Sequence, residues 1–349
     1  MKGSIERVQM LFSGRTPDRP PLFDLLRNDA VLSHFAGEVL TLDNAERVVF
    51  NAYEPAIDAT RPAVRMPHRE ETITLEDGRQ QRHFRWTAWT EPVAYRSDND
   101  YVAVKRRMLT VEPGVWGDGE IRLMDRYLEG IDEYRRRLGE VLFVSGGRSV
   151  GLMGLITESG LDQFVFRNND HPGLIEELLE FETVRAVTFI EHLPIDHQID
   201  VVMVGEDIAF KSATMLSPKW FDEHYHHRLK RIIDAYHHKG IKVIFHSDGN
   251  LNEVLDGLVD AGIDALNPIE ILAGMNIKNI HSRFPDLILV GGIDVSQLLP
   301  LGTPLEVKLT VRIAIEESEG KIMVGSSTEL NNEVPLDNYL ALREVVLDW

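Results

Sequence analysis

Two polar residues in the last third of the chain have the types and spacing of a catalytic pair. His246 and Asp248 directly follow residues 241–245, an apolar run that is typical of a buried strand. Side chains two residues apart at a strand end can point in the same direction. An imidazole beside a carboxylate can transfer protons near neutral pH or bind a divalent metal ion. We therefore predict an active-site role for both residues; the alternative is that His246 caps the next helix while Asp248 begins a turn.

Three further carboxylates, Glu206, Glu270 and Asp294, come just after other apolar runs. A carboxylate that follows a buried strand must be paired with a basic group or bound to a ligand. The carboxyl ends of parallel strands meet at one edge, which is where barrel enzymes place their chemistry. We predict that Glu206 is catalytic and that Glu270 and Asp294 bind substrate, unless each pairs with a neighbouring basic side chain.

The elements that must position these residues alternate regularly in the second half of the chain. Predicted strands at 201–204, 241–245, 264–267, 287–290 and 321–324 are followed by predicted helices at 217–239, 252–261, 277–283, 303–317 and 335–346. Such wholly apolar strands indicate an α/β protein with a parallel sheet covered by helices. The pattern alone fits both a barrel and an open sheet.

The first half is less regular, with predicted strands at 20–25 and 140–144, a helix at 42–57, and mostly helical residues 154–192. Residues 71–86 alternate between polar and apolar side chains around Asp77-Gly78, which predicts a β-hairpin. We interpret this hairpin, at about residues 70–90, as an insertion into one domain that covers residues 1–349.

Composition limits the chemistry and the partners. The chain has no cysteine, so any metal must be held by histidine and carboxylates. The net charge of -19 argues against a nucleic acid or an anionic membrane as a partner. No apolar run is long enough to span a membrane, and Glu6 and Arg7 interrupt the region where a signal peptide would be apolar. We expect a cytoplasmic enzyme that acts on a small molecule.

An ordered set of short motifs resembles the uroporphyrinogen decarboxylase superfamily, which includes cobamide-dependent methyltransferases. The motifs are Gly14-Arg15-Thr16-Pro17-Asp18-Arg19-Pro20-Pro21, Gly205-Glu206-Asp207 with Ser217-Pro218, His246-Ser247-Asp248-Gly249, Gly291-Gly292-Ile293-Asp294 and Pro335-Leu336-Asp337-Asn338-Tyr339. The resemblance covers nearly the whole chain and is strongest from about Met153 onward. It implies a (β/α)8 TIM barrel, often dimeric, that acts on a tetrapyrrole, a corrinoid methyl carrier or a one-carbon substrate.

The chain departs from both better-known branches of this superfamily. Decarboxylases carry two arginines in the loop after the first strand, whereas this loop offers Asp24 and Arg27. The methyltransferases bind zinc through a His-x-Cys pair and a later cysteine. Here His246-Ser247-Asp248 stands in place of that pair, and Glu329 adjoins the position of the later cysteine. The resemblance thus implies a zinc or other divalent site formed by His246, Asp248 and Glu329.

Three hypotheses follow, in order of preference. The first is methyl transfer or demethylation, with a corrinoid or a corrinoid protein as partner and His246, Asp248 and Glu329 holding a metal or transferring protons. The second is a decarboxylase on a carboxylated tetrapyrrole or another carboxylate, with Arg27 and Arg148 as anchors and His246 or Asp24 stabilising the carbanion. The third is a non-catalytic barrel that binds a corrinoid or tetrapyrrole. For all three the resemblance implies a homodimer.

Overall fold

The apolar runs of the second half pair as neighbouring parallel strands. The computed structural model describes residues 3–349, and its largest sheet has the order β11-β10-β9-β8-β7-β6. These strands are β6 (Ser145–Gly146), β7 (Val201–Gly205), β8 (Lys242–His246), β9 (Ala265–Asn267), β10 (Ile288–Ile293) and β11 (Ile322–Ser326). All five predicted strands of the second half are therefore confirmed, with ends that shift by at most three residues.

Shorter parallel contacts close this sheet into a barrel. Leu22 bridges Val324 of β11, and Phe23 bridges Ala59 of β1 (Ala59–Thr60). Strand β1 in turn pairs with β5 (Leu142–Phe143), which leads directly into β6. Eight parallel segments thus follow one another around the barrel, counting β5 and β6 as one. The predicted (β/α)8 barrel is confirmed.

Helix α1 (Ser4–Phe12) closes the amino-terminal end of the barrel. Its Val8, Leu11 and Phe12 belong to the same apolar cluster as Met203 and Ile244, whose side chains come from β7 and β8. Burial of this kind stabilises the barrel by about 25 cal/mol per Å² of apolar surface removed from water. Because this end is packed, the open end is the one where the strands finish and where the predicted site residues lie.

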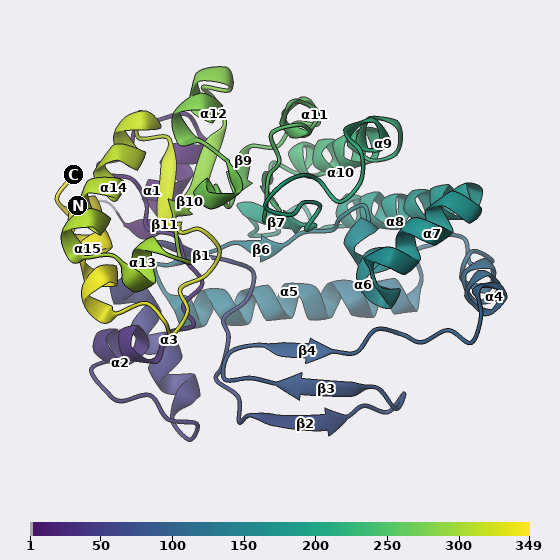
Figure 1. The fold of residues 1–349 in the computed structure, drawn as a ribbon, viewed down its shortest axis with the longest axis horizontal. Helices are drawn as coiled ribbons and strands as arrows, with labels where there is room; N and C mark the ends of the chain where they lie inside the picture. Colours follow the sequence, from purple (N-terminus) through teal and green to yellow (C-terminus); the bar gives the residue numbers. More distant parts are fainter. Residues whose placement is uncertain (1–2) are drawn as a thin grey trace.

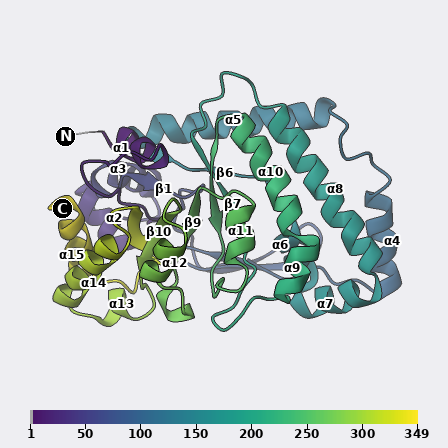
Figure 2. The same cartoon turned by 90° about the horizontal axis from the view of Figure 1, so that it is seen from above.

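The helices lie around the barrel, as Figures 1 and 2 show. They are α2 (Asp29–Ala36), α3 (Ala45–Ala56), α4 (Asp98–Met108), α5 (Asp118–Leu138), α6 (Leu152–Ser159), α7 (Leu161–Asp170), α8 (Pro172–Glu191), α9 (Pro218–His224), α10 (His226–His238), α11 (Leu255–Asp260), the 3-10 helix η1 (Ile271–Ala273), α12 (Ile277–Arg283), α13 (Leu298–Leu301), α14 (Pro304–Glu317) and α15 (Leu336–Leu347). The helix predicted at 217–239 is two helices, because it breaks at the fully buried Tyr225. In residues 3–349 no helix is long and apolar enough to cross a membrane.

The predicted hairpin is present and carries a third strand. Strands β2 (Glu71–Thr74), β3 (Gln80–His83) and β4 (Ala88–Thr90) form an antiparallel sheet that is set apart from the barrel strands (Figure 1). The turn between β2 and β3 contains Gly78 at φ 86°, a left-handed conformation that glycine adopts without strain. Trp86 Nε1 donates to Asp29 Oδ1 at 2.9 Å, which fastens the insertion to the start of α2.

Candidate metal centre at the carboxyl end of the barrel

Two adjacent strand ends bring an imidazole and two carboxylates together. One ligand atom each from Asp207, His246 and Asp248 lies within 4.8 Å of the other two. His246 is the last residue of β8 and lies opposite Gly205, the last residue of β7, so the two loops begin side by side. The backbone N–H of Asp248 donates to Asp207 Oδ1 at 3.2 Å, which ties the two loops together. Three protein ligands is also the number found in catalytic zinc sites, which keep a fourth position open.

The hydrogen bonds of His246 fix its tautomer. Asn267 Nδ2 donates to the carbonyl of Val290 at 3.3 Å, so its Oδ1 faces His246 Nδ1 at 2.7 Å. An amide oxygen accepts only, and His246 Nδ1 therefore carries the proton. Burial and the nearby Arg61 guanidinium lower the pKa of His246 to about 4. The imidazole is thus neutral at pH 7, with the Nε2 lone pair directed into the site.

Arg61 is a central residue of the site that sequence reasoning missed. It follows the two-residue strand β1, and one guanidinium nitrogen donates to His246 Nε2 at 2.9 Å. The other terminal nitrogen donates to the carbonyl of Thr328 at 2.9 Å. Burial lowers the pKa of Arg61, whereas the carboxylates of Asp248, Glu329 and Asp207 raise it, and the pKa falls overall. The Arg61 guanidinium therefore contacts His246 Nε2, the atom that would have to bind a metal ion.

Asp248 has the properties of a proton acceptor. The hydroxyl of Thr328 donates to its Oδ1 at 3.1 Å, and burial together with the negative charge of Asp207 raises its pKa to about 6. A carboxyl that titrates near neutral pH suits general acid-base chemistry. The structure thus brings the predicted pair His246 and Asp248 into one site.

Three of the predicted residues border this site without joining the three-ligand group. Glu329 Oε1 accepts from Arg27 at 2.5 Å, so the predicted anchor Arg27 and the predicted ligand Glu329 form an ion pair with each other. Asp207 stands in the group in place of Glu329. Glu270 lies at the next strand end and accepts from the backbone N–H of Gly249 at 2.8 Å, which holds the loop after β8.

Asp24 and Glu206 face other surroundings. Asp24 is buried below the mouth, where it accepts from the backbone N–H and the hydroxyl of Ser326 at 3.0 and 2.7 Å. Burial raises its pKa to about 6 despite these bonds. Glu206 Oε1 accepts from the backbone N–H of Gly151 at 2.7 Å, so its side chain faces the loop before α6. Burial also raises the pKa of Glu206.

Asp294 and Arg148 have contacts that account for their burial. Asp294 accepts from the backbone N–H groups of Gln297 and Leu298 at 2.7 and 2.8 Å, at the start of α13. Burial alone would raise the pKa of Asp294, but these donors lower it overall. The Arg148 guanidinium lies 3.8 Å from the ring centre of Phe189 on α8 and lines a separate cavity of about 210 Å³. A substrate bound by Arg148 would therefore lie outside the group around His246.

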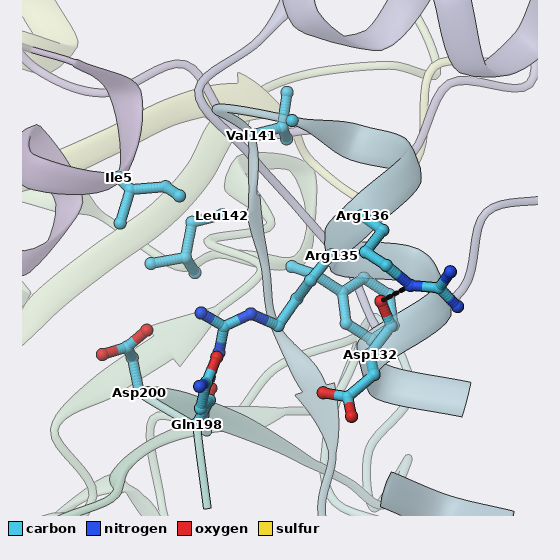
Figure 3. Close-up of a pocket in the computed structure, with 10 residues that line it drawn as sticks. Ile5, Asp132, Arg135, Arg136, Val141, Leu142, Gln198 and Asp200 are labelled. Carbon is cyan, nitrogen blue, oxygen red and sulfur yellow. Dashed lines mark hydrogen bonds between the residues drawn. The ribbon is translucent and has the colours of Figure 1, made fainter. Parts of the chain in front are cut away.

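A cavity at the opposite end of the barrel is no continuation of this site. It has a volume of about 440 Å³ and lies between Ile5 of α1, the carboxyl end of α5 and Leu142 of β5. Figure 3 shows Arg135 extended toward Gln198 and Asp200, which precede β7. Arg135 donates to the carbonyl of Gln198, so its charge already has an acceptor. This end of a barrel contributes to stability rather than to chemistry.

Comparison with known proteins agrees with this architecture. Over its full length the chain matches a methyltransferase from Methanosarcina mazei, with 18% identity, a TM-score of 0.66 and coverage of 100% of this chain and 99% of that one. A B12-independent methionine synthase from Shewanella sp. W3-18-1 matches 95% of this chain and 97% of its own, with 13% identity and a TM-score of 0.48. No curated protein matches in sequence.

The sequence model of the family described as uroporphyrinogen decarboxylase (URO-D) matches residues 125–349, which is more than half of the chain and includes β7, β8 and the group around His246. The chain therefore belongs to the uroporphyrinogen decarboxylase (URO-D) family.

Proposed function

We propose that this protein is a methyl-transfer enzyme that uses a divalent metal ion held by Asp207, His246 and Asp248. The observation that carries the proposal is the Nδ1–H tautomer that these contacts give His246, with two carboxylates beside its Nε2 lone pair. This is the tautomer that a metal ligand needs, and the bond from Nδ1 to Asn267 is the kind of outer contact that orients such ligands. The pair His246 and Asp248 also stands at the position of the zinc ligands of the methyltransferases that the sequence resembles.

The donor set fits zinc or another divalent ion of intermediate hardness. Imidazole and carboxylate are both ordinary zinc ligands, and a site with three protein ligands keeps a position open for substrate. Asp207, Asp248, Glu270 and Glu329 surround the mouth, and only Arg27 and Arg61 oppose them among the groups described above. This local excess of negative charge favours a cation. When bound, the ion would act as a Lewis acid that lowers the pKa of a thiol or hydroxyl acceptor.

The protein's own residues would position the acceptor and remove its proton. One carboxylate oxygen of Asp248 would hold the ion, and the other can accept the proton that the nucleophile loses. The methyl group then passes as a cation equivalent from its donor to the nucleophile, and the donor leaves with the bonding electron pair. Asn267 holds His246 in place, and the hydroxyl of Thr328 holds the carboxylate of Asp248. A corrinoid is the methyl donor that the resemblance implies.

Decarboxylation has weaker support, because its arginine anchors are already engaged. Arg27 is paired with Glu329, and Arg148 is stacked on Phe189 in a separate cavity. Neither guanidinium is directed at the atoms around His246, where a carbanion would be stabilised. An arginine clamp gains its strength from charge-assisted bonds to the substrate, and Arg27 would first have to release Glu329.

The experiment incubates the full chain with zinc, methylcobalamin and a small thiol, and follows loss of the methyl–cobalt absorption together with formation of the thioether. The proposal predicts zinc-dependent transfer that falls at least a hundredfold in His246→Ala and in Asp248→Asn. Rates that are equal in the wild type and both variants would exclude this site as the centre of methyl transfer. Uroporphyrinogen, offered in parallel, would be consumed if the decarboxylase hypothesis holds.

A further inference from the structure

Arg61 occupies the single coordination position that His246 can offer. A neutral imidazole has one lone pair, and in His246 it is on Nε2 because Nδ1 holds the proton toward Asn267. The Arg61 guanidinium donates to this same atom at 2.9 Å. Nε2 cannot accept that bond and ligate a metal ion at the same time. The contact and the metal therefore exclude each other.

Charge adds to this exclusion. Without a metal, Arg61 is the nearby cation whose field opposes the negative charge of the partly buried Asp248 and of Asp207. A divalent ion at the same place would lie next to a like charge beside the buried His246, where such repulsion is stronger than in bulk water. Arg61 must therefore move when a metal binds.

The side chain has acceptors to which it can turn. Its second terminal nitrogen already donates to the carbonyl of Thr328 at 2.9 Å, and Glu329 is one of the carboxylates whose field acts on it. A rotation about the last side-chain bonds would break the bond to His246 while the bond to Thr328 remains.

We propose that Arg61 and a divalent metal ion alternate on His246 Nε2, so that Arg61 sets the metal affinity of the site. The inference rests on the metal site of the proposed function but makes a separate claim about it. Arg61 stabilises the metal-free site, and the metal must displace it. Removal of the guanidinium should then tighten metal binding, although it removes a buried and hydrogen-bonded side chain.

The test measures zinc and manganese dissociation constants by calorimetry on metal-stripped full-length protein. Arg61→Ala should bind at least tenfold more tightly than the wild type. The matched control is Arg27→Ala, which removes the same charge from the same mouth but leaves His246 untouched, because Arg27 pairs with Glu329. It should change affinity less than threefold. Arg61→Met, which keeps the bulk of the side chain, replaces the alanine variant if that variant does not fold.

The outcomes separate the two claims. If Arg61→Ala binds no more tightly than Arg27→Ala while the wild type binds metal, the exchange is refuted and the metal site stands. If neither the wild type nor any Arg61 variant binds metal, both the exchange and the proposed centre are refuted. A second readout is the His246 Nε2 ¹⁵N shift, which should change in metal-free Arg61→Ala and stay at its wild-type value in metal-free Arg27→Ala.

Discussion

Asn267 offers a sharp test of the site because it determines which nitrogen of His246 is free. The perturbations are Asn267→Leu, which removes the acceptor at similar volume, and Asn267→Asp, which keeps an acceptor at the same position. His246 is 7% exposed and Asn267 is 1% exposed, so water cannot readily replace the lost bond. Asn267→Leu should therefore weaken metal binding, whereas Asn267→Asp should not.

The magnitudes follow from the contacts. In Asn267→Leu the buried Nδ1–H of His246 has no acceptor, which should lower the free energy of unfolding by about 1–3 kcal/mol. Loss of an orienting contact of this kind typically weakens metal binding by about 10–100-fold, or about 1.4–2.8 kcal/mol. A carboxylate at position 267 makes the imidazole more basic, so Asn267→Asp should bind metal as tightly as the wild type or more tightly.

The assays are urea unfolding of the metal-free variants and zinc titration by calorimetry, with His246→Ala as the reference for complete loss. Selective ¹⁵N labelling of histidine reports the tautomer directly. The reasoning is refuted if Asn267→Leu retains zinc affinity within threefold of the wild type while His246→Ala loses it. Orientation of His246 by Asn267 would then have no bearing on the site.

Three further predictions concern the scaffold. Asp58 is 1% exposed and accepts hydrogen bonds from two arginines and from the backbone N–H of Leu22. Asp58→Ala should therefore lower the free energy of unfolding in urea by about 3–5 kcal/mol. A loss below about 1 kcal/mol would contradict a stabilising role for this buried carboxylate. Asp294→Ala should lower the free energy of unfolding by about 0.5–2 kcal/mol, because the backbone N–H groups of Gln297 and Leu298 at the start of α13 lose their acceptor. An unchanged melting temperature would contradict this structural contribution. Asp24 holds its proton more tightly in the folded state, with a pKa of about 6 against 3.8, so its contribution to stability should fall by up to about 3 kcal/mol as pH rises from about 4 to 6. The pKa of His246 is lowered to about 4, so its contribution to stability rises over the same pH range. The free energy of unfolding is therefore measured against pH for the wild type and for Asp24→Asn, which share the His246 contribution. Parallel curves for the two proteins would contradict the role of Asp24.

The fold of the second half was predictable because its strands are almost wholly buried and several of its helices have clear ends. Helices at 277–283 and 304–317 begin and end where their caps predict, and Thr303 forms a capping box with Glu306. The strands of the first half are different. Strand β1 is two residues long and exists because it pairs with β5 and with Phe23, both distant in sequence. Such a strand leaves no periodic pattern to detect.

Because strand β1 could not be predicted, part of the site could not be predicted either. Arg61 follows β1, so it could not be assigned to the barrel mouth without that strand. Of the two carboxylates after β7, Glu206 was selected and stays a predicted catalytic residue. Its neighbour Asp207 is the one whose carboxylate lies beside His246, because neighbouring side chains at a strand end face opposite ways. His246 and Asp248 were identified because both follow one long and unambiguous strand.

The most direct test of the account is a crystal structure of the full chain with zinc, read by anomalous scattering at the zinc edge. The account predicts one strong peak ligated by His246 Nε2 and the carboxylates of Asp207 and Asp248, with Arg61 turned away from His246. A structure at saturating zinc that shows no anomalous density at this position, with Arg61 still bonded to His246, would contradict it.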